Sequence, residues 1–272
     1  MYRALNSLLN ELLTMEPSPH SMTAPVLSPR SLIGPVSIAV MTEDEAILRV
    51  EAMIDANGER IVAFCNAHSV NLARRNGRLR DAFDRALVLN DGIGVDLARK
   101  WLEGAPFPAN LAGTDFLTRL LRDHRTPLAL YLLGSKPGVG SLTTVGLATI
   151  APQHRVVGIQ DGYFPDTQSD AVVADIIRCK PDIVLVGMGQ PRQEIWAARH
   201  AAQTGALVIC VGAYLDFVAG VFPRAPTLLR KLRAEWLYRL MLEPRRLFSR
   251  YVIGNPKFLL GILNDRRRQK SR

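Results

Sequence analysis

Between residues 61 and 211, six short apolar runs alternate with segments of helical length, and this alternation constrains the fold more than any other feature. The runs are Ile61–Cys65, Ala86–Leu89, Leu128–Leu133, Arg155–Ile159, Asp182–Val186 and Ala206–Val211. Segments with helical spacing between them include Val95–Leu102, Thr114–Asp123, Ser169–Cys179 and Gln193–Gln203. Short apolar strands that alternate with helices are typical of a parallel sheet covered on both faces. The sequence therefore predicts an α/β fold with a doubly wound, mainly parallel sheet.

Changes in composition divide the chain into three parts. Residues 1–41 read as a leader and linker, because leucines recur at helical spacing within residues 1–13 and Pro17–Pro35 is rich in Pro and Ser. The sheet domain is expected over residues 42–225. Residues 226–272 form an appendage in which strand patterns stop and helices are predicted over Thr227–Leu242, Pro244–Ile253 and Pro256–Arg268.

The positive charge of the chain is concentrated in this appendage. The net charge is +9, and residues 224–272 carry 14 Lys or Arg against 3 Asp or Glu. A local basic excess favours a polyanionic partner such as an anionic lipid surface, a phosphate group or a nucleic acid. A solvated helix face explains such a tail equally well, so charge alone does not select the partner.

Cysteine usage and hydropathy indicate where the protein works. Cys65, Cys179 and Cys210 are far apart and odd in number, which favours reduced thiols in the cytoplasm. No apolar run approaches the ~20 residues needed to span a bilayer, and Met1–Leu13 lacks the organisation of a signal peptide. We therefore expect a cytoplasmic protein.

Polar side chains collect after the predicted strands, where ligands bind in open parallel sheets. Asp91 follows the second strand directly, between Asn90 and Gly92, and is our candidate for a general base. A turn aspartate bonded to its own backbone is the alternative. His68, two residues beyond Asn66, is a second candidate base, although a lone histidine more often caps a helix or lies satisfied near the core.

The glycine-rich turns suit phosphate binding, because glycine allows close approach to backbone N–H groups and to the next helix. However, the turn from Gly134 to Gly140 is neither G-x-G-x-x-G nor a P-loop, and no Asp-x-Asp pair or His/Cys cluster offers a metal site. We therefore expect no metal and no cofactor.

An ordered series of motifs resembles the WecG/TagA/CpsF glycosyltransferases, also called glycosyltransferase family 26. Residues 187–194, GMGQPRQE, match its G-x-G-x-P-x-Q-E signature. The series continues with DGIG at 91–94, GTD at 113–115, LGSKPG at 133–138, GYF at 162–164, VGAYLD at 211–216, RAP at 224–226 and EWLYR at 235–239. The resemblance implies a Rossmann-like fold. It also implies inverting, metal-independent transfer from a UDP-sugar to a polyprenyl-diphosphate-linked sugar at the cytoplasmic membrane face.

The resemblance also assigns roles to residues. Asp91 matches the proposed base, Gln193 the signature glutamine near the donor, and Asn66 the asparagine after the first strand. The predicted donor-binding set is Asn66, Asn90, Asn110, Gly134, Gly189, Gln190, Gln193 and Glu194. In the appendage, which the family is thought to use to close the site, Arg239, Arg246 and Arg250 are the candidates for reaching the diphosphate.

Two departures from the family pattern bear on the donor sugar. Many members have Thr where this chain has Phe64, and Arg where it has Asn110. With the Asn66-Ala67-His68 sequence, this is more similar to the exopolysaccharide branch, which includes glucosyltransferases. UDP-glucose, UDP-N-acetylmannosamine and another hexose donor remain open.

The appendage interleaves aromatic residues with arginines, a pattern that favours the membrane interface. We therefore expect peripheral attachment to an anionic membrane surface, and the resemblance implies possible self-association. Three alternatives are a nucleic-acid-binding protein, a nicotinamide-dependent oxidoreductase and a non-catalytic scaffold. The acidic and amide groups at the strand ends argue against the first, and the missing glycine fingerprint argues against the second. Asp91 with the Gln193-Glu194 pair argues weakly against the third.

Overall fold

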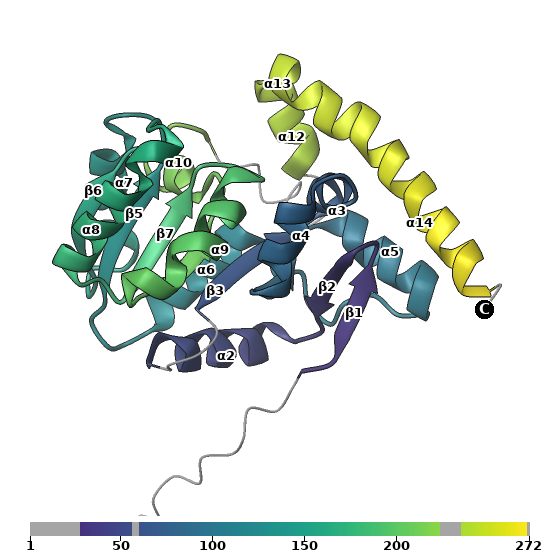
Figure 1. Ribbon diagram of the computed structural model, residues 1–272, viewed down its shortest axis with the longest axis horizontal. Helices are drawn as coiled ribbons and strands as arrows, with labels where there is room; N and C mark the ends of the chain where they lie inside the picture. Colours follow the sequence, from purple (N-terminus) through teal and green to yellow (C-terminus); the bar gives the residue numbers. More distant parts are fainter. Residues whose placement is uncertain (1–27, 56–59, 224–234, 271–272) are drawn as a thin grey trace, which may run out of the picture.

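A computed structural model describes residues 28–55, 60–223 and 235–270 (Figure 1). Its centre is a six-stranded sheet in the order β4-β3-β8-β7-β5-β6, and every neighbouring pair is parallel. The strands are β3(Ile61–Cys65), β4(Leu87–Asn90), β5(Ala129–Gly134), β6(Arg155–Gln160), β7(Ile183–Gly187) and β8(Leu207–Cys210). All six predicted strands are confirmed, and the sheet is Rossmann-like. β3, β4, β5 and β8 are buried along their whole length, which explains why they read as continuous apolar runs.

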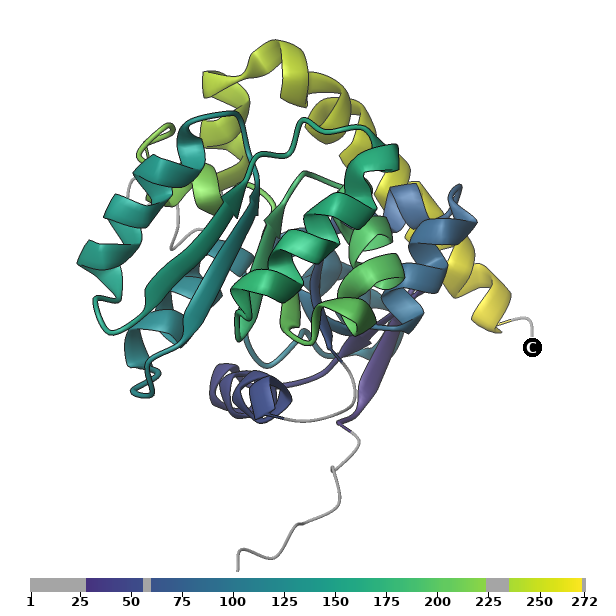
Figure 2. The same cartoon turned by 60° about the vertical axis from the view of Figure 1, so that its left-hand side comes forward.

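Helices cover both faces of the sheet, as Figure 2 shows. One face packs against α3(Ala67–Ala73), α4(Gly77–Asp84), α5(Ile93–Glu103), α8(Ser169–Cys179) and α9(Arg192–Thr204). The other packs against α2(Glu43–Asp55), α6(Gly113–Asp123), α7(Val139–Ile150) and α10(Tyr214–Val218). Successive residues of β3 alternate between the two hydrophobic clusters, since Ala63 and Cys65 enter one and Val62 and Phe64 the other. The 3-10 turn η1(Asp166–Gln168) precedes α8.

An antiparallel hairpin occupies residues that the sequence analysis assigned to the leader and linker. It consists of β1(Arg30–Ile33) and β2(Val36–Ala39), joined by Gly34 and Pro35. Gly34 has a φ of +61°, and a Cβ there would lie 2.8 Å from the Val70 side chain, so glycine is required at this turn. The linker interpretation is therefore wrong for residues 30–39, because Ile33, Val36 and Ile38 are buried in the core. The predicted helix within residues 1–13 lies outside the described residues.

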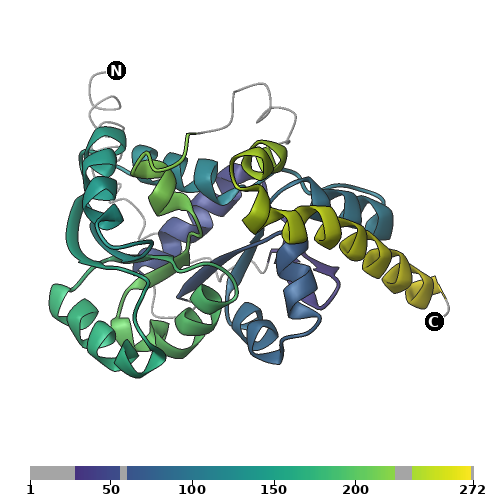
Figure 3. The same ribbon diagram turned by 90° about the horizontal axis from the view of Figure 1, so that it is seen from above.

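The appendage lies over the carboxyl edge of the sheet (Figures 1 and 3). It comprises α12(Glu235–Leu242), α13(Pro244–Phe248), the π-helical turn η2(Ser249–Ile253) and α14(Gly254–Lys270). The expected interruption near Pro256 is absent, because η2 continues directly into α14 and Pro256 lies in the first turn of that helix. The start predicted at Thr227 falls outside the described residues. Within the described ranges, no helix is both long enough and apolar enough to cross a membrane.

Specific contacts dock α14 onto α3 and α5. Phe258 and Ile262 are buried in the same hydrophobic cluster as the sheet. The Asn71 amide donates to the Gly254 carbonyl at 2.7 Å. Arg74 forms an ion pair with Asp265 in which both side chains are about three-quarters buried. The second half of the appendage is thus part of the core rather than a solvated tail.

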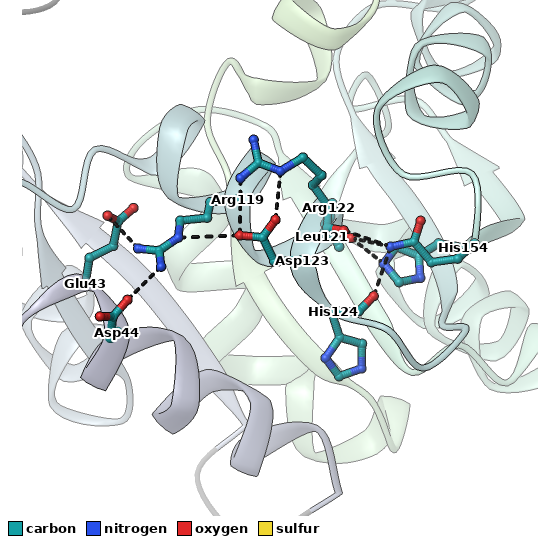
Figure 4. A network of polar contacts seen from close by, with 9 residues as sticks. Glu43, Asp44, Arg119, Leu121, Arg122, Asp123, His124 and His154 are labelled. Carbon is teal, nitrogen blue, oxygen red and sulfur yellow. Dashed lines mark hydrogen bonds and ion pairs between the residues drawn. The ribbon is translucent and has the colours of Figure 1, made fainter.

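A polar network fixes α6, whose first turn carries the Gly113-Thr114-Asp115 motif (Figure 4). Arg119 forms ion pairs with Glu43 at 2.8 Å, with Asp44 at 2.6 Å and with Asp123 at 3.5 Å. At the other end of the helix, the Gln153 amide donates to the carbonyls of Leu121, Arg122 and His124. These bonds satisfy carbonyls that an α-helix leaves without partners at its C-terminus.

Candidate functional site

Asp91 lies immediately beyond β4, at the carboxyl edge of the sheet, where it is half-buried. Its backbone N–H donates to the Cys65 carbonyl at 2.9 Å, which extends the β3–β4 ladder by one residue. The Asn66 side chain donates from Nδ2 to its carboxylate Oδ2 at 3.2 Å. Burial raises the pKa of Asp91, while the Asn66 hydrogen bond and the charges of Arg250 and Arg239 oppose that rise. The structure thus brings Asp91 and Asn66 together at this edge.

The orientation of the Asn66 amide follows from its position at the start of α3. Asn66 is the N-cap, and its Oδ1 accepts the backbone N–H groups of His68 at 3.1 Å and Ser69 at 3.2 Å. Because the oxygen is committed to the helix, the NH2 group points to the opposite side, toward Asp91. The cap thus presents a hydrogen-bond donor to the candidate base.

His68, the alternative base, lies in the first turn of α3 and is half-buried. Burial and the positive charge of Arg250 lower its pKa to about 4. The imidazole is therefore neutral at pH 7. Burial and Arg250 both oppose the cation that His68 would become on accepting a proton, whereas burial of Asp91 favours its protonated form, so the surroundings favour Asp91 for that role.

Asn90 and Asn110 shape the turn that carries Asp91. Asn90 is fully buried, and its Nδ2 donates to the Ala109 carbonyl at 2.7 Å and to Asp96 at 3.4 Å. Asn110 Oδ1 accepts the Gly92 backbone N–H at 2.8 Å. Asn90 and Asn110, two members of the predicted donor-binding set, thus form these hydrogen bonds with the protein itself. Asp96, which the sequence analysis did not single out, is a buried partner in this arrangement.

The glycine turns after β5, β7 and β8 approach one another closely. A Cβ on Gly134 would lie 2.4 Å from the Gly187 backbone carbon, and a Cβ on Gly187 would lie 2.8 Å from the Gly212 carbonyl oxygen. Gly134 also has a φ of +142°. No other residue fits at Gly134, because real Cβ atoms do not approach backbone so closely. Beyond this turn, a cavity of about 180 Å³ is lined by Lys136, Pro137, Gly138, Gly140, Ser141, Ile159, Gln160 and Asp161.

Gln193 and Glu194 lie beneath this edge rather than on its open surface. They are 2% and 1% exposed. Gln193 Oε1 accepts the backbone N–H groups of Gly189 and Gly212, both at 3.2 Å, and its Nε2 donates to Glu194 at 2.8 Å. Burial raises the Glu194 pKa to about 7. The signature pair therefore ties two glycine turns together.

Gln190 joins the loop after β7 to the start of α3. Its Nε2 donates to the Phe64 carbonyl at 3.1 Å, and its Oε1 accepts the Ser69 hydroxyl at 2.9 Å. Arg192, whose side chain the motif did not single out, donates to the Gly162 carbonyl at 2.5 Å and lies over the Phe164 ring. Sequence reasoning missed Ser69, because a serine between His68 and Val70 is not distinguished in the sequence from a residue that only packs.

The appendage brings two of its three candidate arginines to the site. The charge of Arg250 acts on His68, Asp91 and Glu194, and the charge of Arg239 acts on Asp91. Arg239 lies 5.2 Å over the Phe217 ring, and the Arg250 Nε is buried with no hydrogen-bond partner among the described residues. A buried donor of this kind is suited to an anionic ligand. Arg246 lies in α13, but its side chain is outside the described part of the chain.

Within the described residues, no three His, Cys, Asp or Glu side chains come together in a group that could hold a metal ion. The site consists of a carboxylate held by an amide, a rim of glycine turns and two arginines whose charges act on the carboxylate. This arrangement can accept a proton at Asp91 and stabilise negative charge at the arginines.

Comparison with known proteins shows the family of this chain. Residues 31–272 match the Glycosyl transferase WecG/TagA/CpsF family. An N-acetylglucosaminyldiphosphoundecaprenol N-acetyl-beta-D-mannosaminyltransferase of Bacillus subtilis is 31% identical over 199 residues, 71% of this chain and 75% of the relative. Proteins of the same description from Bacillus spizizenii and Staphylococcus aureus are 30% identical over 219 residues and 31% identical over 216 residues. They cover 79% and 77% of this chain, and 82% of each relative. The chain therefore belongs to the WecG/TagA/CpsF family and is a glycosyltransferase.

Proposed function

We propose that the protein transfers N-acetylmannosamine from its UDP derivative to a polyprenyl-diphosphate-linked saccharide during cell-envelope glycan synthesis, with Asp91 as the general base. The observation that carries the reaction is the half-buried Asp91 carboxylate, bonded to Asn66 and facing the charges of Arg239 and Arg250. The relatives are named as N-acetylmannosaminyltransferases that act on N-acetylglucosaminyldiphosphoundecaprenol. Their names support the N-acetylmannosamine alternative better than the exopolysaccharide glucosyltransferase reading favoured by Phe64 and Asn110.

In this mechanism, the acceptor hydroxyl attacks the anomeric carbon of the donor while Asp91 takes its proton. A bond forms between the acceptor oxygen and the anomeric carbon, and the bond between that carbon and the UDP oxygen breaks, so that UDP leaves with inversion. Burial of Asp91 suits this role, because a carboxylate with a raised pKa is a stronger base at neutral pH.

The developing charge on UDP requires stabilisation without an Asp-x-Asp metal site. The glycine turns at Gly134 and Gly189 allow close approach to backbone N–H groups, and α7 and α9 begin directly beyond them. Arg239 and Arg250 supply positive charge near Asp91. The hydrogen bonds described above hold these turns in place, and they come from Asn66, Asn90, Asn110, Gln190, Gln193 and Glu194.

The appendage also presents apolar side chains to solvent. Phe248, Ile253 and Leu260 are 53%, 58% and 67% exposed, and Arg245 and Lys257 are exposed on the same helices. Exposed apolar residues among cations are typical of peripheral binding to an anionic membrane, where a polyprenyl acceptor resides. We infer attachment at the cytoplasmic face. Self-association remains a prediction from the family resemblance.

A donor panel tests the proposal. UDP release is measured with UDP-N-acetylmannosamine, UDP-N-acetylglucosamine and UDP-glucose, with and without a polyprenyl-diphosphate N-acetylglucosamine acceptor, and with and without EDTA. Acceptor-dependent release with UDP-N-acetylmannosamine, unchanged by EDTA, is the expected result. Release with UDP-glucose alone would restore the exopolysaccharide reading. No release with any donor, together with no UDP binding by calorimetry, would favour a non-catalytic scaffold.

A further inference from the structure

Ser69 is fully buried and lies at the junction between α3 and the loop after β7. Its hydroxyl oxygen lies 2.9 Å from Gln190 Oε1 and 3.2 Å from Asn66 Oδ1, and it accepts the Asn66 backbone N–H at 3.0 Å. Ser69 is thus one hydrogen bond away from Asn66, which is itself bonded to Asp91. No step of the proposed reaction uses this hydroxyl.

The neighbouring amides determine where the single hydroxyl proton goes. Asn66 Oδ1 already accepts two backbone N–H groups. Gln190 donates its Nε2 to the Phe64 carbonyl, so its Oε1 faces Ser69 and needs a donor. Because the bond to Gln190 is also the shorter one, the proton belongs there. The Ser69 oxygen remains an acceptor for the Asn66 backbone.

We propose that Ser69 is a positioning residue for the transfer reaction, because its hydroxyl ties Gln190 to the backbone of the Asn66 cap and so holds the start of α3, which carries the Asn66 side chain, against Asp91. The inference rests on the proposed function, in which Asp91 is the base. It links the signature loop of residues 187–194 to the base through one buried hydroxyl. Removal of that hydroxyl leaves the Asn66 backbone N–H and Gln190 Oε1 unpaired in a buried place. The start of α3 and the Gln190 loop are therefore expected to shift, and the Asn66 side chain to move away from Asp91 with them.

Besides the hydrogen bond from Asn66, several titratable or charged groups act on Asp91. Arg239 from α12 and Arg250 from η2 favour its ionised form, and Asp115 from α6 disfavours it. The Cys65 thiol at the end of β3 is buried beside Asp91, and its own pKa is raised well above the ordinary value, so it stays neutral. Of these groups only the Cys65 thiol interacts with Ser69, and because the Ser69 hydroxyl lowers the Cys65 pKa, the thiol stays neutral when that hydroxyl is removed. A loss of the Asn66 donor alone therefore raises the Asp91 pKa and moves the acidic limb of the kcat/KM profile to higher pH.

The test compares Ser69→Ala with Ser31→Ala in the full-length protein, using UDP-N-acetylmannosamine and a polyprenyl-diphosphate N-acetylglucosamine. Ser31, in strand β1 of the hairpin, is the matched control. It is also fully buried, and its hydroxyl donates to Glu103 Oε1 at 2.7 Å. We expect Ser69→Ala to lower kcat about 10- to 100-fold, with donor KM changed less than about 3-fold and the acidic limb moved to higher pH. Ser31→Ala should keep the wild-type kcat and pH profile.

A double-mutant cycle separates this inference from the proposed function. If Ser69 acts through Asp91, Ser69→Ala should change the residual rate of Asp91→Asn less than about 2-fold. An unchanged kcat and pH profile for Ser69→Ala, or an equal loss in the Asp91→Asn background, would overturn the inference. Wild-type turnover by Asp91→Asn would instead remove the base role itself. If Ser69→Ala does not fold, Ser69→Cys, of nearly the same size and with a weak donor, carries the same measurements.

Discussion

Asp91 and Glu194 are two acids at one sheet edge in different surroundings. Asp91 is half-buried and has a donor in Asn66 and two arginine charges nearby, so its negative charge is supported where the acceptor must bind. Glu194 is almost fully buried, and its pKa is raised to about 7 even with the Gln193 hydrogen bond. We propose that Asp91 reacts as the base, whereas Glu194 bonds Gln193, which in turn holds the glycine turns.

Glu194 makes the stability of the fold depend on pH. Its pKa rises from an ordinary value of 4.5 to about 7 on folding, so the folded protein binds the proton more tightly than the unfolded chain between these values. Its contribution to stability is therefore lost as pH rises from about 4.5 to about 7. Wild type should therefore lose on the order of 3 kcal/mol of its free energy of unfolding between pH 5 and pH 8 through this group, and Glu194→Gln should not show that loss.

Urea denaturation of both proteins at the two pH values measures this loss, and other titrating groups cancel in the difference. Glu43→Gln, which removes a more exposed carboxylate on α2, is the control and should follow the wild-type pH dependence. Parallel pH dependence of wild type and Glu194→Gln would show that Glu194 keeps its ordinary pKa.

At the scale of elements, sequence patterns predicted the sheet well because buried parallel strands are locally apolar. They missed the β1–β2 hairpin, where Gly34-Pro35 lies between two four-residue strands in a stretch whose Pro and Ser content indicated a linker. Alternation of buried positions around a Gly-Pro turn was the available signal. The inward orientation of Gln193 was not predictable, because its partners Gly189 and Gly212 lie on turns after different strands.

Docking of α14 depends on the ion pair between Arg74 and Asp265, which lies between Gly34 and Gly261. Asp265→Lys places two cations together in a partly buried position. We expect faster amide hydrogen exchange across α14 and a several-fold loss of turnover, because Arg250 precedes this helix directly. Asn264→Lys, at an exposed neighbouring position, introduces a lysine but leaves the ion pair intact and is the control. Equal exchange in the two variants would show that the ion pair does not hold the helix.

At the scale of the whole molecule, the appendage joins the two surfaces that the reaction needs. Its inner side carries Phe258 and Ile262 into the core and brings Arg239 and Arg250 to Asp91. Its outer side exposes apolar residues and cations. We infer that a membrane-bound acceptor reaches Asp91 where these two sides meet, at the carboxyl edge of the sheet.

Membrane attachment is tested by sedimentation with phosphatidylglycerol-containing vesicles. Replacement of Phe248, Ile253 and Leu260 by Ser should weaken binding about 10-fold or more, because their apolar surface no longer enters the interface. Replacement of Leu48, Leu142 and Val145, which are at least as exposed but lie on α2 and α7, should not weaken it. High salt should lower binding of the wild type. Equal binding by both triple variants would contradict an attachment surface on the appendage.

The most direct test of the central claim is the mass of the acceptor after reaction. Wild-type protein and Asp91→Asn are incubated with UDP-N-acetylmannosamine and polyprenyl-diphosphate N-acetylglucosamine. The mass of the lipid product is then determined by mass spectrometry. We predict that wild type adds one N-acetylhexosamine per acceptor, and that Asp91→Asn binds UDP normally but forms product at least about 100-fold more slowly. If the wild-type protein is folded and binds UDP but leaves the acceptor unmodified, the proposed reaction is contradicted. Equal rates for the two proteins would contradict Asp91 as the base.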